Sequence, residues 1–282
     1  MGETTGISWT DKTFNPWWGC ARVSPGCVNC YADRDATRWG MPDLWHQHGP
    51  RRMMSENYWR QPAKWNREAA AAGQHVKVFC ASMADVFEDH PEVTEARKRL
   101  FGLIEETPWL TWQLLTKRPE NIPAMTSWGA SGWPANAWVG TSVENQDFAQ
   151  ERILRLLRNV PSAQLLFLSC EPLLGPVDLR NIRAGNGALV DCLAGDVKTS
   201  LGEIYAACPA SISWVITGGE SGPETKRREM DPAWLTSIVE ACRTAGVPVW
   251  TKQDSGPRSG HQGRIPDDLW LHQFPITYRR AA

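Results

Sequence analysis

Short apolar runs alternate with amphipathic segments along most of the chain, and each run has the length of one β-strand. Because strands that alternate with helices form βαβ units, the pattern predicts a parallel sheet. The number of runs favours an α/β fold built as a full or partial, TIM-like (β/α) barrel rather than a short open sheet. The predicted strands are Ile7–Thr10, Val76–Ala81, Thr111–Thr116, Ala137–Val143, Gln164–Cys170, Ser211–Thr217 and Val247–Thr251.

The segments between these strands have the spacing and the end signals of helices. In residues 92–106, for example, Leu100, Leu103 and Ile104 fall on one helical face. Gly73 and Gly246 follow two of the segments, as expected for C-terminal caps. The predicted helices are Ala32–Trp39, Pro62–Ala72, Glu92–Glu106, Gln146–Arg158 and, with Asp231 as its N-cap, Pro232–Ala245.

Two segments depart from the alternation. Residues 175–210 are Gly-rich and less periodic, which predicts an insertion, and a mixed tail begins at about residue 254. No internal repeat, low-complexity tract or clear domain boundary divides the chain. Residues 1–282 are therefore predicted to form a single domain.

Polar residues and glycines follow almost every predicted strand. In a parallel barrel these strand ends meet on one face, and that face holds the active site. Each residue alone reads more readily as a solvated strand end, so their recurrence at the same end is what predicts a site. The residues are Ser82 and Asp85, Thr116, Lys117 and Arg118, Ser142 and Glu144, Cys170 and Glu171, Gly218, Gly219 and Glu220, and finally Lys252 and Gln253.

A loop with three cysteines follows the first predicted strand. Cys20, Cys27 and Cys30 have the spacing Cys-x6-Cys-x2-Cys, and the Ser24–Gly26 turn between them can return Cys20 towards Cys27. Converging thiolates suit an iron–sulfur cluster or a zinc ion, because soft ligands select these metals. A zinc site needs a fourth ligand, for which His46, His48 or Cys80 are available. The absence of a second ligand pair favours the cluster.

The composition limits the class of protein. The chain has 282 residues, of which 42% are hydrophobic and 22% charged, so a globular fold with a sizeable core is expected. A net charge of −1 gives no overall attraction to nucleic acid. We found no apolar run of membrane-spanning length and no signal peptide, so a cytoplasmic location without membrane contact is expected. Thiols stay reduced there, and the 8 cysteines are better read as ligands or apolar residues than as disulfides.

The cysteine loop after the first strand of an α/β barrel resembles the radical S-adenosylmethionine (SAM) superfamily. In that superfamily three cysteines hold a [4Fe–4S] cluster whose fourth iron binds SAM. One electron cleaves SAM to a 5′-deoxyadenosyl radical, which abstracts hydrogen from the substrate. The usual spacing is Cys-x3-Cys-x2-Cys with an aromatic residue before the last cysteine. Here the first gap is longer, Asn29 takes the aromatic position, and Tyr31 follows Cys30.

Nearly the whole chain resembles the phage-associated three-cysteine-motif proteins, a family of phages, prophages and bacteria that is treated as radical-SAM-like. Several long motifs in the same order carry the resemblance. They are Gly6–Thr10, Thr13–Trp17, Gly19–Cys20, Ser24–Cys27, Asn29–Ala32, Ser169–Leu173, Gly218–Gly222 and Lys252–Gln253.

The resemblance implies roles for the polar residues around the cysteines. The cluster and SAM are the implied cofactors, with Cys20, Cys27 and Cys30 as the iron ligands. Tyr31 is expected to pack on SAM, Ser82 and Asp85 to bind its amino group, Lys117 or Arg118 its carboxylate, and Ser142 and Glu144 its ribose hydroxyls. Gly218, Gly219 and Glu220 resemble the Gly-Gly-Glu that binds the SAM amino group in the superfamily, although that motif ends the second strand there and the sixth here.

Four residues are predicted to be catalytic: Cys170, Glu171, Glu220 and Lys252. Cys170 would return a hydrogen atom to a product radical, and its alternative is a small buried apolar residue. Glu220 would bind the substrate or the SAM ribose, and its alternative is a tight turn that the two preceding glycines explain.

A nucleobase in nucleic acid or a free nucleotide is the expected substrate. The candidate partners are an external electron donor and a separate partner protein. The basic clusters Lys226–Arg228, Arg51–Arg52 and Arg279–Arg280, with tryptophans nearby, suit phosphates and bases, although each also reads as an exposed charged surface. Two other functions stay open. One is a zinc-stabilised, non-catalytic phage protein that binds nucleic acid or a partner; the other is a barrel hydrolase that uses Glu144, Glu171 or Glu220.

Overall fold

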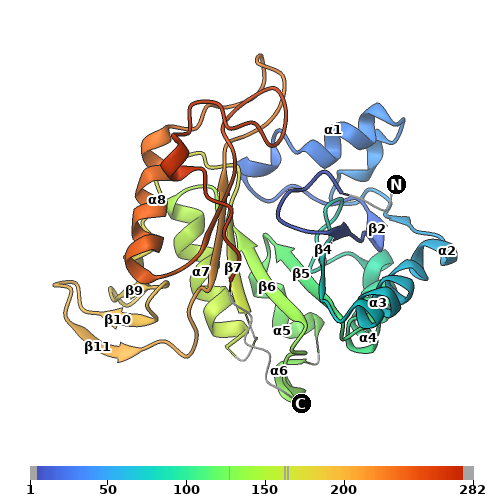
Figure 1. The fold of residues 1–282 in the computed structure, drawn as a ribbon, viewed down its shortest axis with the longest axis horizontal. Helices are drawn as coiled ribbons and strands as arrows, with labels where there is room; N and C mark the ends of the chain where they lie inside the picture. Colours follow the sequence, from blue (N-terminus) through green and yellow to red (C-terminus); the bar gives the residue numbers. More distant parts are fainter. Residues whose placement is uncertain (1–4, 127, 162, 164, 276–282) are drawn as a thin grey trace.

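The computed structural model describes residues 5–126, 128–161, 163 and 165–275. Its centre is a sheet of parallel strands that curls into a half-barrel (Figure 1). The sheet has 7 strands in the order β1-β4-β5-β6-β7-β12-β13. They are β1 (Lys12–Thr13), β4 (Val76–Cys80), β5 (Leu110–Thr116), β6 (Ala137–Ser142), β7 (Leu165–Cys170), β12 (Trp214–Gly218) and β13 (Val249–Gln253). The predicted parallel (β/α) fold is confirmed, and the barrel is a partial one.

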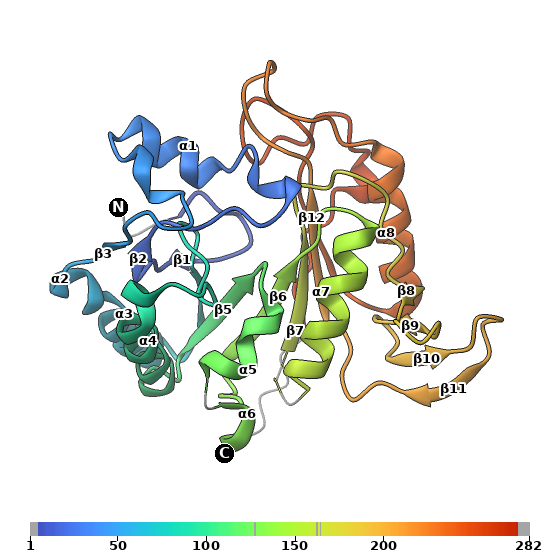
Figure 2. The same ribbon diagram turned by 180° about the vertical axis from the view of Figure 1, so that it is seen from behind.

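The helices cover the convex side of this sheet, except for α1, which lies over the carboxyl ends of the strands (Figures 1 and 2). They are α1 (Tyr31–Arg38), α2 (Glu56–Trp59), α3 (Gln61–Ala72), α4 (Thr94–Glu106), α5 (Ile122–Met125), α6 (Trp128–Ser131), α7 (Gln146–Asn159) and α8 (Pro232–Ala245). Short 3-10 turns are η1 (Pro25–Cys27), η2 (Pro42–Leu44), η3 (Pro91–Val93), η4 (Pro119–Asn121) and η5 (Asp267–Leu269).

The predicted helix ends have a clear local cause. The Asp231 side chain accepts a hydrogen bond from the Ala233 amide, 2.9 Å away, and so satisfies one of the free donors at the start of α8. Gly73 and Gly246 end α3 and α8 with φ angles of 63° and 70°, in the left-handed region that glycine adopts without a steric penalty.

The first strand was predicted in the wrong place. Residues 7–10 form a turn closed by the Thr10 amide on the Ile7 carbonyl oxygen, and the strand lies at Lys12–Thr13, which pairs with β4. The apolar residue that suggested a strand, Trp9, instead packs across the concave side against Phe79, with ring centroids 4.6 Å apart. The segment between β1 and the cysteine loop contains β2 (Trp17–Trp18), which pairs with β3 (Arg52–Met53). Gln164, predicted in the fifth strand, lies outside the described residues.

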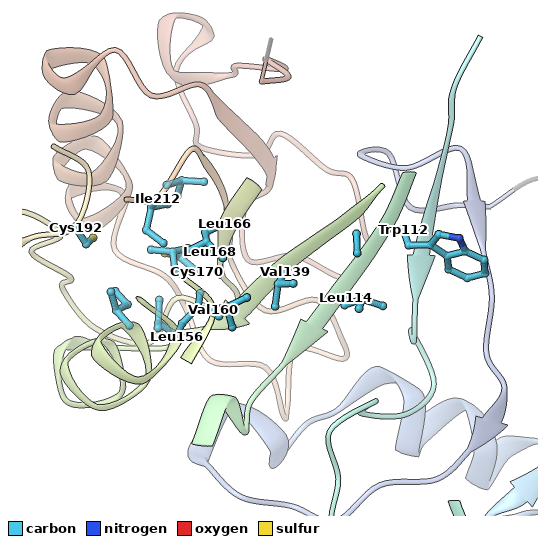
Figure 3. Close-up of a cluster of buried hydrophobic side chains, with 14 of the residues drawn as sticks. Trp112, Leu114, Val139, Leu156, Val160, Leu166, Leu168, Cys170, Cys192 and Ile212 are labelled. Carbon is cyan, nitrogen blue, oxygen red and sulfur yellow. The ribbon is translucent and has the colours of Figure 1, made fainter. Parts of the chain in front are cut away.

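The two faces of the sheet have different cores, because successive side chains of a strand point to opposite sides. The convex face packs mainly aliphatic side chains against the helices, as Leu114, Val139 and Leu156 illustrate (Figure 3). The concave face holds a second, mostly aromatic cluster. Its buried members are Trp9, Phe79, Trp138, Leu165, Phe167, Trp214, Ile216 and Trp250.

The segment predicted as an insertion forms a separate sheet of 4 antiparallel strands in the order β11-β10-β9-β8. The strands are β8 (Ile182–Arg183), β9 (Leu189–Asp191), β10 (Asp196–Lys198) and β11 (Ile204–Ala207). They lie beside the lower end of α8 and away from α1 (Figure 2). The division into one domain with an insertion stays a prediction.

The tail after β13 returns along the edge of the sheet. The Thr251 amide donates to Leu271 and the Gln273 amide to Val249, at 2.7 and 3.0 Å. These bonds cover the edge of β13, which would otherwise expose free backbone groups. No helix in the described part of the chain is long and apolar enough to span a membrane.

Candidate active site at the carboxyl ends of the strands

A cavity of about 440 Å³ lies at the carboxyl ends of the parallel strands, below α1. Its floor is apolar and includes Ile7, Trp9, Phe79 and Leu115. Polar side chains surround this floor. They occupy the last inward-facing positions at the carboxyl ends of the strands, above the aromatic cluster. The predicted site residues that line it are Cys20, Cys27, Cys30, Tyr31, Ser82, Asp85, Lys117, Arg118, Ser142, Glu171, Gly219, Glu220 and Lys252.

All three cysteines of the predicted loop line this cavity. The Cys20 amide donates to the Leu44 carbonyl oxygen at 3.1 Å, and the Cys27 amide closes a turn on Ser24 at 2.9 Å. Cys30 is the N-cap residue of α1. A Cβ atom on Gly26 would overlap the carboxyl group of Glu144, so only glycine fits at this point of the turn.

The thiols of Cys20 and Cys30 are surrounded by hydrogen-bond donors. Burial raises the pKa of Cys20, while the Arg118 guanidinium, whose Nη1 lies 3.6 Å from its sulfur, acts in the opposite direction. Burial also raises the pKa of Cys30, and the backbone amides of Asp33 and Ala32 at the start of α1 oppose it. These donors would stabilise thiolates once the sulfurs bind a cation.

A preformed metal-ion site is absent from the described residues. Within residues 5–275, apart from the few positions not described, no group of three or more His, Cys, Asp or Glu side chains is arranged to hold a metal ion.

Asp85 and Arg118 form an ion pair with each other. Arg118 Nη1 lies 2.8 Å from Asp85 Oδ2, and its Nη2 donates to the Ala21 carbonyl oxygen at 2.7 Å. Asp85 also accepts from the Thr116 hydroxyl and from the Lys117 amide, at 2.7 and 3.0 Å. The binding of the SAM amino group by Asp85 and of its carboxylate by Arg118 stays a prediction. Both groups are already bonded, and together they tie the cysteine loop to β5.

The role of Glu144 in holding ribose hydroxyls stays a prediction; its side chain is fully buried and does not line the cavity. Its oxygens lie 2.6 Å from Lys117 Nζ and 2.9 Å from Arg152 Nη1. The Ser24 hydroxyl also donates to it at 2.7 Å. Burial alone would raise the pKa of Glu144, but the two cations and these hydrogen bonds outweigh it and lower the pKa. Glu144 thus connects the cysteine loop, β5 and α7.

Glu171 and Lys252 form an ion pair of 2.9 Å within the cavity, between the ends of β7 and β13. The Ser169 hydroxyl donates to the second oxygen of Glu171 at 3.2 Å. Both side chains of the pair keep some exposure, 11% and 17%, so a ligand in the cavity can reach them.

Glu220 joins the cysteine loop to the loop after β12. It accepts from the Asn29 side-chain amide and the Arg228 backbone amide, both at 2.8 Å, and pairs with the Arg228 guanidinium. Burial acts to raise the pKa of Glu220, but the hydrogen bonds from Arg228 and Asn29 lower it. The carboxylate reaches the cavity wall, but its bonds are those of a positioning group.

Gly218 and Gly219 allow a close approach of two loops. Gly218 does not line the cavity, whereas Gly219 does. A Cβ on Gly219 would lie 2.8 Å from the Asp254 carbonyl carbon. The Gly219 amide donates to the Gln253 carbonyl oxygen at 2.9 Å. The contact with β13, and not a left-handed turn, accounts for these glycines.

Cys170 was predicted to act on a product radical, but its side chain lies on the convex side of β7, among Leu166, Leu168 and Ile212 (Figure 3). It is fully buried and does not line the cavity, and burial raises its pKa. The alternative interpretation as a small apolar residue fits this position. Its neighbours Ser169 and Glu171 face the cavity instead, because side chains alternate along a strand.

Tyr31, Ser82 and Ser142 stand where a ligand in the cavity would meet them. The Tyr31 hydroxyl donates to the Ser82 carbonyl oxygen at 2.9 Å, which holds the ring at the start of α1. The Ser82 hydroxyl is already bonded to the Asn15 side chain. No hydrogen bond of the Ser142 hydroxyl occurs among the described residues.

The basic clusters differ in their surroundings. Arg51 is buried and paired with Glu88 at 2.8 Å, so it supports the loop and is not a surface for phosphate. Lys226 is exposed, while Arg227 and Arg228 pair with Glu229 and Glu220. Arg279 and Arg280 lie outside the described residues.

The sequence predictions missed Asn29, Arg34 and Asp35, which also line the cavity. The helical period was the available signal for the last two, since Arg34 lies one turn after Cys30 on α1. Nothing in the sequence singled out the contact of Asn29 with Glu220, because it joins residues far apart in the chain.

Comparisons with known proteins add a family and a distant similarity. No curated protein matches the chain. A solved structure of a spore photoproduct lyase mutant, with bound AdoMet and dinucleoside spore photoproduct, is similar with a TM-score of 0.40 and 16% identity. This match covers 57% of this chain and 45% of that one, so it spans less than half of the lyase chain. A family match covers residues 4–267, and the chain belongs to the family described as "Protein of unknown function (DUF5131)".

Proposed function

We propose that the chain is a radical SAM-type enzyme. Cys20, Cys27 and Cys30 would hold a [4Fe–4S] cluster, and SAM and a nucleobase or nucleotide would bind in the cavity. The observation that carries the proposal is that three cysteines line one cavity at the carboxyl ends of a parallel half-barrel.

The donor set fits such a cluster in its chemistry. Thiolates are the usual ligands of iron–sulfur clusters, and hydrogen bonds to the sulfurs tune the reduction potential of the cluster. Here the guanidinium of Arg118 approaches Cys20, and backbone amides at the start of α1 approach Cys30. When bound, the cluster supplies the single electron that reductive cleavage of SAM requires.

The other residues of the cavity would bind and shield the reactants. Trp9, Phe79 and Leu115 make a floor that excludes water from a reactive species. The Glu171–Lys252 pair offers one acceptor and one donor group to a polar ligand, and the Tyr31 ring offers a flat surface for stacking. Lys117, Arg118 and Glu144 would act indirectly, by keeping the cysteine loop in place.

Anaerobic reconstitution tests the proposal. We expect about four iron and four sulfide per chain in the wild-type protein. A variant with Cys20→Ala, Cys27→Ala and Cys30→Ala should contain neither. Cys170→Ala is the matched control and should retain the full content, because this thiol lies on the other side of the sheet. Addition of SAM and dithionite to the reconstituted protein should then yield 5′-deoxyadenosine.

Other outcomes would point elsewhere. Stoichiometric zinc in the protein as purified from cells, with no reconstitutable iron, would sink the radical proposal and favour the zinc-stabilised binding protein. A hydrolytic activity that survives loss of the three cysteines would favour a barrel hydrolase.

A further inference from the structure

The charged side chains that line the cavity are nearly all paired within the protein. Lys117 pairs with Glu144, Arg118 with Asp85, and Lys252 with Glu171. Glu220 pairs with Arg228, and Arg22 with Asp33. Paired groups have less attraction left for a charged ligand. The two lining residues that differ are Arg34 and Asp35 on α1.

Arg34 is an exposed cation without an acidic partner. Its Nη1 donates to the Ser221 carbonyl oxygen at 3.3 Å, and no carboxylate lies within ion-pair distance in the described part of the chain. A guanidinium presents a planar set of donors that matches a phosphate group. Arg34 is therefore available to an anion at the edge of the cavity.

Asp35 restricts where such an anion can lie. It is half-buried, lines the same cavity, and makes no ion pair or side-chain hydrogen bond among the residues described. Its carboxylate repels a phosphate and accepts hydrogen bonds from an N–H group. Arg34 and Asp35 together favour a ligand that keeps its phosphate outside the cavity and directs a nitrogen-bearing group into it.

Further exposed cations lie in segments that border the cavity, and they have no ion pairs in the described ranges. Arg38 lies one turn later on α1. Lys226 belongs to the loop after β12, and its carbonyl oxygen accepts from Asn29 at 2.7 Å. Arg258 stands between Pro257 and Ser259, which both line the cavity. The same loop also carries the exposed acids Glu224, Glu229 and Asp231, of which Glu229 pairs with Arg227 and Arg264.

The basic rim thus comes from three separate segments at one end of the molecule. Figures 1 and 2 show α1 and the loops that follow β12 and β13 rising from the same end of the sheet. Four cations spread over these segments suit several phosphates better than one. A polynucleotide has this charge pattern, and a single strand leaves its bases free to enter a cavity.

We propose that this rim binds the phosphate backbone of a single-stranded nucleic acid, with Arg34 on the phosphate next to the base that enters the cavity. This inference rests on the proposed function. It narrows the proposed substrate from any nucleotide to a base within a single-stranded nucleic acid. Arg34 acts on substrate binding and has no part in holding the cluster.

Fluorescence anisotropy with a labelled single-stranded oligonucleotide of about 12 residues, as DNA and as RNA, tests the inference. The reconstituted protein is titrated at several salt concentrations. Arg34→Ala should weaken binding about tenfold and lower the slope of log K against log salt by about one. Arg34→Glu should weaken it further. Arg183→Glu, which alters an exposed arginine on the separate β8–β11 sheet, is the matched control and should bind as the wild type does.

Three results would overturn the proposal: no salt-dependent binding by the wild-type protein, equal loss in the Arg34→Glu and Arg183→Glu variants, or a mononucleotide that competes as well as the strand. Reductive SAM cleavage by the wild-type protein is measured without any oligonucleotide. Its absence would count against the proposed function alone and would leave the binding result standing.

Discussion

Cysteines lie on both sides of the central sheet, but in different surroundings. On the convex face, Cys170 is fully buried among aliphatic side chains below α7 and α8. On the concave side, Cys20, Cys27 and Cys30 keep partial exposure around a cavity. The sulfur chemistry open to each cysteine therefore depends on the side of the sheet that it faces. A thiol that only packs is inert, whereas one that faces a cavity can bind a ligand.

The concave side itself changes character along the strands. Its lower half is filled by aromatic rings, such as Trp138 and Trp214 with centroids 6.1 Å apart. Its upper half holds ion pairs, such as Glu171 with Lys252. Charges are retained at the end where loops and a cavity provide partners and water, and they are excluded where rings pack without gaps.

The largest effect on stability is expected from loss of the Glu144 carboxylate, which holds the upper half of the concave side together. Glu144→Ala would leave Lys117 and the buried Arg152 without their partner, and should lower the free energy of unfolding by about 3–5 kcal/mol. Urea denaturation followed by fluorescence measures this change. The control Glu120→Ala removes an exposed ion pair with Arg155 and should cost less than about 1 kcal/mol. Equal losses would show that burial of Glu144 contributes nothing.

The same carboxylate predicts an acid-sensitive fold. The pKa of Glu144 is lowered in the folded protein, so its contribution to stability is complete above the ordinary pKa of 4.5. That contribution is lost as the pH falls from this value through the lower, folded pKa. Unfolding free energies measured between about pH 7 and pH 3 should show a smaller acid-induced loss in Glu144→Ala than in the wild type. Parallel curves for the two proteins would contradict this assignment.

A smaller effect of opposite sign, a gain in stability, is expected in the aromatic lower half of the concave side. Gln113 is fully buried on β5, and both polar atoms of its side chain lack a hydrogen-bond partner. Gln113→Met removes this penalty at similar volume and should raise the free energy of unfolding by about 1 kcal/mol. The matched control is Gln253→Met, because the buried Gln253 bonds to Gly219 and Ser259 and should lose stability. A loss for Gln113→Met in the same urea assay would mean that its amide is satisfied in solution.

The smallest effect is expected from the cysteine of the convex face. Cys170→Ala removes one buried sulfur from the aliphatic core and should cost about 1 kcal/mol of stability. Iron content and SAM cleavage, measured after reconstitution, should be unchanged. A folded Cys170→Ala protein that binds iron but no longer cleaves SAM would restore a chemical role to this thiol.

Local patterns were enough to predict most of the elements. The boundaries of α3, α7 and α8 followed from apolar spacing and from residues such as Asp231 and Gly246, because caps and periodicity act within a few residues of the chain. The convergence of polar strand ends was also predictable, since parallel strands share one direction. The short first strand was misplaced because Trp9 has the composition of a strand residue but packs from a turn.

The sequence by itself determined the parallel α/β architecture, the common face of the strand ends and the grouping of the three cysteines in one loop. Only the tertiary structure decided which polar residues face the cavity and which form ion pairs with each other. Asp85 with Arg118 and Glu144 with Lys117 looked like ligand-binding groups along the chain, yet they are internal ion pairs. Nothing in the sequence singled out Arg34, yet it lies at the cavity edge and has no ion pair among the described residues. The physical reason is that pairing depends on distances between strands and loops remote in sequence, and burial then makes each pairing costly to break.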